Sequence, residues 1–200
     1  MKTLLVATGN PGKVREFAQA LQADGFEVLD LNELRDKTEV DETGSTFEAN
    51  AILKAEGYSA RTDHLVVADD SGIEVDALDG APGVYSARYG GDGLDDKGRN
   101  AKLLEAVRDV PDEQRTARFR CVLALAQHGK TIATFDGTIE GKLGYEEKGE
   151  NGFGYDPLFI YPPAGCTTAE LTPEEKRKVS HRGKAIADLV LFLRRTFPAS

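Results

Sequence analysis

Residues 3–13 read TLLVATGNPGK, and this opening stretch decides the fold class. Residues 3–7 are a short, largely apolar run, which predicts a buried strand. The turn-rich loop from Thr8 to Lys13 follows. Apolar residues then recur at helical spacing, at Val14, Phe17, Ala18 and Leu21. The chain therefore opens with a strand, a glycine loop and a helix, as α/β proteins do.

The remaining elements alternate without a regular βαβ period. Further strands are predicted at 26–29, at 65–68, over the alternating residues 119–125, and at 131–136 after a turn at 128–130. Helices are predicted from the capping box Ser45/Glu48 to Ala60, around 101–107, from Thr172-Pro173 onward, and near the end of the chain. We expect a mixed central sheet flanked by helices, in a single domain over residues 1–200 without a linker.

Composition narrows the class of protein. The chain has 200 residues, of which 25 are basic and 34 acidic, so its net charge is −9. Such an acidic protein is a poor general binder of nucleic acid polymers or anionic membranes. No stretch approaches the ~20 apolar residues that span a bilayer. Cys121 and Cys166 form neither a disulfide scaffold nor a zinc motif, and Cys121 is predicted to be a small buried hydrophobe. We expect a cytoplasmic protein.

The loop from Thr8 to Lys13 is the first candidate site. A strand that ends in a glycine loop and opens a helix presents backbone N–H groups to an anion, and Lys13 adds a charge. The loop is not a Walker A motif, because Ala7 and Val14 stand where that motif needs Gly and Ser or Thr. Phosphate binding and a plain strand-to-helix turn are equally compatible with the pattern.

The acidic pair Asp69-Asp70 follows the strand at 65–68. Neighbouring side chains on a strand point to opposite faces, so the two carboxylates are not expected to form one acid/base pair. One of them can hold a divalent ion or accept a proton from water. Asp-Asp-Ser-Gly is also good turn chemistry, and by itself the pattern favours a tight acidic turn before a returning strand at 73–77.

Three further segments carry weaker patterns. Asn50 and Lys54 share one helix face with Phe47, either toward a ligand or as an ordinary solvated face. In Gly152–Pro157 the glycines on either side leave the Phe153 ring accessible for stacking on a base. The backbone and Asp156 could then bind the edge of that base. The alternative is a turn in which Phe153 belongs to the core. Residues 172–195 carry seven basic and three acidic side chains, which suits a small anionic ligand or solvated helices.

The order of these motifs is more specific than any one of them. They are TGNxGK at 8–13, ETGxTFxxNAxxKA at 42–55, ADDSG at 68–72, GAPGxxSARY at 80–89, GFGYDP at 152–157 and EKxxxSHRG at 175–183. This series closely resembles the RdgB-type (Ham-like) inosine/xanthosine triphosphate pyrophosphatases, and the resemblance extends from residue 3 to about residue 195.

The resemblance implies a function and an architecture. The family hydrolyses deaminated purine nucleoside triphosphates (ITP, dITP and XTP) to the monophosphate and pyrophosphate, and so removes them from the nucleotide pool. It uses Mg²⁺, with Mn²⁺ as an alternative ion. We therefore expect a two-lobed α/β protein with an active-site cleft between the lobes. We also expect a homodimer with a nucleotide substrate, and with neither a nucleic acid polymer nor a membrane as partner.

The resemblance also implies roles for single residues. Asp70 matches the catalytic proton acceptor and a metal ligand, Glu42 a second metal ligand, and Ser71 a substrate contact. The remaining matches are substrate contacts: Thr8, Gly9, Asn10, Pro11, Gly12 and Lys13 for the triphosphate, Lys54 and Lys176 for phosphate, and Phe153, Gly154, Tyr155, Asp156, His181 and Arg182 for base and sugar.

Two other functions stay open at this point. One is a Maf-type pyrophosphatase for pyrimidine or modified nucleotides, which the elements at 153–156 and 180–182 argue against. The other is a nucleotide-sensing module that binds without turnover. The presence of Glu42, Asp70 and the lysines argues against a sensor, because a protein that only binds the nucleotide needs no metal ligand and base beside the α-phosphate.

Overall fold

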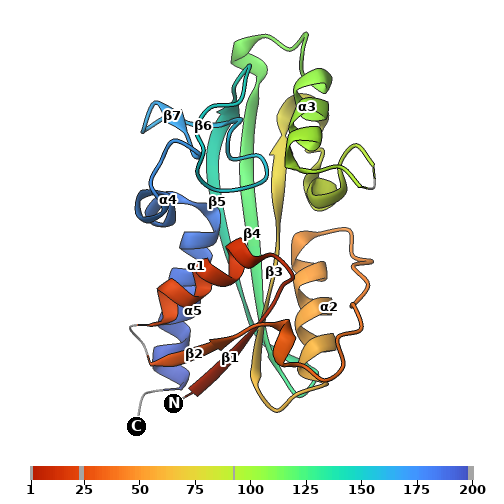
Figure 1. Ribbon diagram of the computed structural model, residues 1–200, viewed down its shortest axis with the longest axis vertical. Helices are drawn as coiled ribbons and strands as arrows, with labels where there is room; N and C mark the ends of the chain where they lie inside the picture. Colours follow the sequence, from red (N-terminus) through yellow and green to blue (C-terminus); the bar gives the residue numbers. More distant parts are fainter. Residues whose placement is uncertain (1, 23–24, 92, 198–200) are drawn as a thin grey trace. The chain divides into compact units, whose positions relative to one another are not determined.

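The computed structural model describes residues 2–22, 25–91 and 93–197 (Figure 1). The strands are β1 (Lys2–Ala7), β2 (Phe26–Leu29), β3 (Leu65–Val75), β4 (Thr116–Gln127), β5 (Lys130–Leu143), β6 (Phe159–Tyr161) and β7 (Cys166–Thr167). The helices are α1 (Pro11–Leu21), α2 (Phe47–Ser59), α3 (Asp96–Ala106), α4 (Pro173–Val179) and α5 (His181–Thr196). None of the described helices is long and apolar enough to cross a membrane.

The strands form one mixed sheet in the order β2-β1-β3-β4-β5-β6-β7. β1 pairs in parallel with β2 and with β3, whereas β6 pairs antiparallel with β5 and β7. The long strands β4 and β5 are joined by His128 and Gly129, which both have positive φ angles (52° and 74°). A two-residue turn with two positive φ angles joins antiparallel strands, so the predicted hairpin is confirmed. The predicted mixed α/β sheet is confirmed as well.

The chain divides into two compact units, and it passes from one to the other once in each of β3, β4 and β5 and once at the start of α5. The first unit comprises residues 1–70, 121–137 and 182–200. Its larger core lies between one face of β1, β3 and β4 and the apolar faces of α1 and α5. This core includes Leu4, Val6, Phe17, Leu21, Leu65, Val67, Cys121, Leu123, Leu189 and Leu193.

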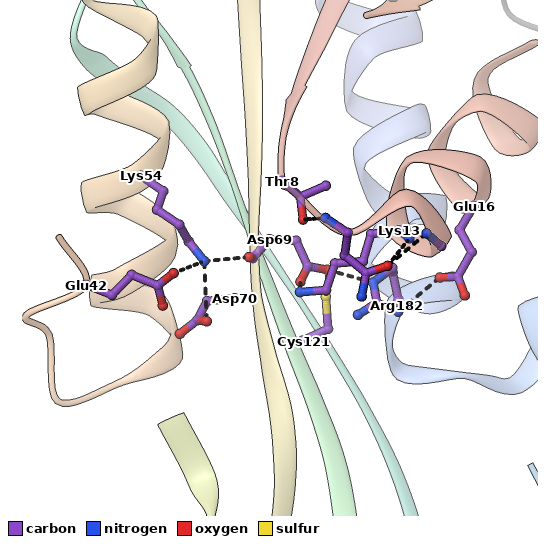
Figure 2. Close-up of polar contacts among 11 residues, drawn as sticks. Thr8, Lys13, Glu16, Glu42, Lys54, Asp69, Asp70, Cys121 and Arg182 are labelled. Atoms are coloured by element: carbon purple, nitrogen blue, oxygen red, sulfur yellow. Dashed lines mark hydrogen bonds and ion pairs between the residues drawn. The ribbon is translucent and has the colours of Figure 1, made fainter. Parts of the chain in front are cut away.

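The opposite face of the same strands faces α2. Side chains alternate along a strand, so Leu5 and Val66, which are fully buried, point away from the first core. The α2 side chains Phe47, Ala51 and Ala55 are buried as well. In the close-up of Figure 2, α2 lies on one side of β3 and the helices α1 and α5 on the other. The first unit is therefore a sheet covered by helices on both faces.

The second unit comprises residues 71–120 and 138–181. Its core is built from the last residues of β3 and β5, the first residues of β4, the helix α3 and the loop before β6. The buried residues include Ile73, Val75, Leu103, Val107, Phe119, Ile139, Tyr155, Leu158 and Phe159. Arg115, only 1% exposed, donates to the carbonyl oxygens of Val107, Leu143 and Gly144, which ties α3 to the end of β5.

Two local predictions were wrong. The acidic turn at 69–72 does not exist, since β3 runs without a break from Leu65 to Val75. Asp69 and Asp70 pair with Lys13, Lys54 and Arg182, which are distant in the sequence, and not with the local backbone of a turn. The N-cap of α2 is Thr46, whose Oγ1 accepts the N–H of Ala49 (3.1 Å), and not Ser45. The predicted capping box at Thr172 and Glu175 is confirmed.

Candidate active site

The glycine loop after β1 is organised by its own polar side chains. Asn10 is the N-cap of α1, and its Oδ1 accepts the N–H groups of Gly12 (2.8 Å) and Lys13 (3.3 Å). Thr8 Oγ1 accepts the N–H of Asn10 (3.2 Å), and Pro11 starts the helix with a φ angle that suits this position. These hydrogen bonds fix the backbone conformation of the loop, and Lys13 projects from the first turn of the helix.

The two adjacent aspartates of β3 point to opposite faces of the sheet, as predicted. Figure 2 shows Asp69 on the side of α1 and α5, and Asp70 on the side of α2. Asp69 continues the inward row of Leu65 and Val67. Each carboxylate therefore has its own surroundings, and these surroundings differ in charge.

Asp69 is the centre of a buried network of charges. Its side chain is fully buried; Oδ1 pairs with the Lys13 ammonium, and Oδ2 accepts from Arg182 Nε (2.7 Å) and from the Cys121 thiol (3.2 Å). Arg182 also pairs with Glu16 (3.0 Å). Although burial opposes it, the pairing with Arg182 and Lys13 holds the pKa of Asp69 well below its usual range. Asp69 is therefore an anion that ties α1 to the start of α5.

Asp70 lies in the opposite electrostatic situation. Burial raises the pKa of its carboxyl, the Glu42 carboxylate adds to this, and the Lys54 ammonium opposes it. Lys54 Nζ lies between the acids, 3.0 Å from Glu42 Oε1 and 3.4 Å from Asp70 Oδ1, and donates to the backbone oxygen of Asp69 (2.8 Å). Burial lowers the pKa of Lys54, but Asp70 and Glu42 more than offset it, so its pKa is raised.

The Asp70 side offers ligands for a hard divalent cation. Asp70 Oδ2 is buried, and among the described residues it has no hydrogen-bond partner. The Glu42 carboxylate, 30% exposed, shares the Lys54 ammonium with it. Within the described ranges no cluster of three or more His, Cys, Asp or Glu side chains could hold a metal. Mg²⁺ commonly binds through one or two carboxylates, with waters and phosphates as the other ligands, so the residues present fit it.

In the second unit, a further buried aspartate holds the loop that carries Phe153. Asp156 Oδ2 accepts the N–H of Phe153 (2.9 Å) and pairs with the Lys176 ammonium, while Oδ1 accepts from Thr168 Oγ1 (2.9 Å). Lys176 Nζ also lies 5.0 Å from the centre of the Phe153 ring. Gly152 has a φ of +79°, and a Cβ there would lie 2.2 Å from Asp156 Oδ2. Both Asp156 oxygens are therefore engaged within the protein.

The other predicted base-pocket residues of the second unit also have internal partners. Tyr155 is buried and its hydroxyl donates to the carbonyl oxygen of Ser86 (2.8 Å). The N–H of Gly154 donates to Asp96 (2.8 Å), and its carbonyl accepts from Asn100 (3.1 Å). The imidazole of His181 stacks on Phe119 at a centroid distance of 4.8 Å.

The predicted site residues thus fall into two groups, one in each compact unit. The first unit brings together the glycine loop with Lys13, the metal-side residues Glu42, Lys54 and Asp70, and Arg182. The second unit holds Ser71, Phe153–Asp156, Lys176 and His181.

Sequence reasoning missed several residues that hold these groups in place. Among them are Glu16, Asp69 as a charge centre, Asp96, Asn100 and Thr168. It also classed Cys121 as a plain hydrophobe, whereas its thiol contacts Asp69. Only Asp69 carried a usable signal, because a second acid on the inward face of a buried strand requires a cationic partner.

Comparison with known proteins identifies the family. A model of the Ham1 family matches residues 4–192. The chain belongs to the Ham1 family. Similar proteins include the dITP/XTP pyrophosphatases of Bacillus subtilis (strain 168), 48% identical over 94% of this chain and 96% of that protein, and of Exiguobacterium sp. (strain ATCC BAA-1283 / AT1b), 55% identical over 93% and 94%.

Solved structures agree with the Ham1 fold. A HAM1 protein from Coxiella burnetii is 38% identical, with a TM-score of 0.88 over 98% of this chain and all of that one. The Staphylococcus aureus Ham1 protein is 41% identical, with a TM-score of 0.86 over 97% of this chain and 99% of that one. The expected resemblance and the fold class are confirmed.

Proposed function

We propose that this protein hydrolyses the deaminated purine nucleoside triphosphates dITP, ITP and XTP to the nucleoside monophosphate and pyrophosphate. The relatives named dITP/XTP pyrophosphatase match it at about half of all positions over almost its whole length. The observation that carries the proposal is the arrangement around Asp70, in the middle of β3. A buried carboxylate with an unpaired oxygen, a second carboxylate and a largely buried ammonium lie together there, all from the described residues.

These residues suit attack of water at the α-phosphorus. Asp70 would accept the proton of the attacking water, because burial and the nearby Glu42 raise its pKa and make it a stronger base. A bond forms from the water oxygen to the α-phosphorus, and the bond to the bridging oxygen breaks to release pyrophosphate. Lys54 keeps its charge, since its pKa is raised, and so would balance the negative charge of the phosphates.

We further propose Mg²⁺ as the physiological ion, with Mn²⁺ as an alternative. Glu42 and Asp70 would hold it, and when bound it would neutralise phosphate charge and polarise the phosphoryl oxygens. The support is the unpaired buried Asp70 oxygen beside a second, partly exposed carboxylate.

For the phosphates and the base we propose the residues that the motifs implicate. Lys13 and the Thr8–Gly12 loop suit the triphosphate, since α1 begins there and its first N–H groups are oriented by Asn10. In the second unit the Phe153 ring is partly exposed on a loop that Asp156 and Lys176 hold, which supports base stacking. We assign recognition of the 6-keto group to a donor of His181 or Arg182.

The test is pyrophosphate release in Mg²⁺ from ITP, dITP, XTP, ATP, GTP and the pyrimidine triphosphates, measured side by side. Fast release from the first three substrates alone is the expected result. Release of orthophosphate instead would place the cleavage at another phosphorus and contradict the proposed attack. Tight ITP binding without turnover would support a sensor instead. A His181→Ala and an Arg182→Ala variant that both keep the ITP-to-ATP preference would contradict the base assignment.

We also propose a homodimer in the cytoplasm. The support for the dimer is the family resemblance alone, and light scattering of the purified protein tests it. Support for the cytoplasm comes from the nucleotide substrate and from the cysteines Cys121 and Cys166, which are both free. A monomeric mass at micromolar concentration would contradict the dimer.

A further inference from the structure

Asn50 of α2 is a buried polar residue that no part of the proposed mechanism uses. It is fully buried, although asparagine is mostly an exposed residue. Its Oδ1 accepts the N–H of Gly44 at 2.8 Å. A backbone N–H needs an acceptor, so this bond fixes which end of the amide is the oxygen and leaves Nδ2 pointing the other way. Nδ2 is buried and has no hydrogen-bond partner among the described residues.

The unused end of this amide lies on the helix face that faces the acidic site. Asn50 precedes Lys54 by four residues, so the two side chains lie one above the other on α2. Lys54 contacts Asp70 Oδ1 (3.4 Å). Asp70 Oδ2, like Asn50 Nδ2, is buried and lacks a partner in the part of the chain that the structure describes.

The other end of the amide connects to the second carboxylate. Gly44 lies two residues after Glu42, in the segment that precedes α2. The close contact leaves no space for a side chain, because a Cβ on Gly44 would lie 2.7 Å from Asn50 Oδ1 and 2.7 Å from Ala49 Cβ. One asparagine therefore fixes the segment that carries Glu42 against the helix that carries Lys54.

We propose that Asn50 is a positioning residue of the divalent-metal site: through the Gly44 N–H it fixes the segment that carries Glu42 against α2, beside Lys54, whose ammonium contacts both Glu42 and Asp70. The proposal rests on the metal-binding part of the proposed function. Groups that hold metal ligands in place typically contribute 10–100-fold to metal affinity or activity. Asn50 does not itself touch the substrate in this proposal.

The chain offers a matched control on the same helix. Ser59 is also a fully buried polar residue of α2, and its Oγ accepts a glycine N–H, that of Gly129 (3.0 Å). Ser59→Ala therefore removes a comparable buried tether from α2 without touching the acidic site. Gly44→Ala provides a second perturbation of the proposed link, because it disturbs the contact while leaving the Asn50 amide intact.

The experiment is a titration with Mn²⁺, followed by the EPR signal of the free ion. It is run on the whole protein alone and on the protein saturated with the α,β-methylene analogue of ITP. We expect Asn50→Ala to weaken Mn²⁺ binding at least tenfold, Gly44→Ala to weaken it by a smaller factor, and Ser59→Ala to leave it within twofold of the wild type. Amide exchange at Gly44 should accelerate in Asn50→Ala and stay unchanged in Ser59→Ala.

Several outcomes would overturn the proposal. They are an Asn50→Ala protein with Mn²⁺ affinity within twofold of wild type, an equal loss in Ser59→Ala, or a wild type that binds no Mn²⁺ under either condition. If Asn50→Ala does not fold, Gly44→Ala decides by the same criterion. Failure of the proposed function appears separately, because Mn²⁺ affinity of the protein alone can depend on Asn50 even if dITP, ITP and XTP are not hydrolysed.

Discussion

Asp69→Asn is the substitution that most directly tests the buried charge network. It preserves the shape of the side chain but removes the negative charge that Lys13 and Arg182 share. The Asp69 carboxylate is 0% exposed and the Arg182 side chain 3%, so water cannot replace the lost partner. Removal of one partner from a buried ion pair typically costs about 3–5 kcal/mol. We expect Asp69→Asn to lower the free energy of unfolding by this amount, because Arg182 and Lys13 both lose the carboxylate with which they pair.

Urea denaturation followed by circular dichroism measures this loss, and Glu16→Gln is the matched control. It also removes one negative charge from Arg182, but Glu16 is 26% exposed and Asp69 remains in place. Its expected cost is at most about 1 kcal/mol, as for a partly exposed pair. A loss below about 1 kcal/mol in Asp69→Asn, or equal losses in both variants, would refute the view that Asp69 is the centre of the network.

Asp70, the pH dependence of the Asp69 network and Asp156 each give a further prediction. Asp70→Asn should reduce turnover by about 10²–10⁴-fold, the usual contribution of a general base. Because burial raises the pKa of Asp70, the charged form is disfavoured in the fold, so the melting temperature should not fall; a lower melting temperature would contradict this. The pKa of Asp69 is lowered, so its stabilisation is present above the unfolded value of ~3.9 and lost as pH falls through the folded value. The difference in free energy of unfolding between wild type and Asp69→Asn should therefore be constant from neutral pH to about pH 5 and shrink below about pH 4. Urea denaturation at several pH values measures this difference, and a difference that persists below about pH 4 would contradict the prediction. Asp156→Asn should raise KM for ITP more than it lowers kcat, since it releases the Phe153 loop; steady-state kinetics with unchanged KM would exclude this role.

Much of the fold could be predicted because periodicity is a local property. The apolar run before Thr8, the helical spacing from Val14 to Leu21 and the alternation along β4 each depend on neighbours within a few residues. The capping box at Thr172 has a similarly local cause. At α2 the predicted cap, Ser45, lies one residue before the observed cap, Thr46; residue type does not distinguish the two, since both hydroxyls suit the position.

Residues that hold the site together could not be predicted in the same way. Lys13 and Arg182 reach Asp69 from 56 and 113 residues away in the sequence, and Thr168 reaches Asp156 by a return of the chain through β6 and β7. The motifs named most of the charged residues, but not which pairs they form. Both oxygens of Asp156 serve the protein itself, although the motif alone is equally compatible with a carboxylate that reads the base.

The correct and the incorrect prediction at Asp69-Asp70 have the same physical origin. Strand geometry alone placed the two side chains on opposite faces, and that prediction is confirmed (Figure 2). The turn was predicted because Asp and Ser side chains usually bond their own backbone, which favours turns when nothing else competes. Here Lys54, Lys13 and Arg182 compete, and they bind the carboxylates more strongly than local N–H groups would. The cations that we propose for phosphate binding are thus also paired with the two aspartates where β3 continues as a strand instead of turning.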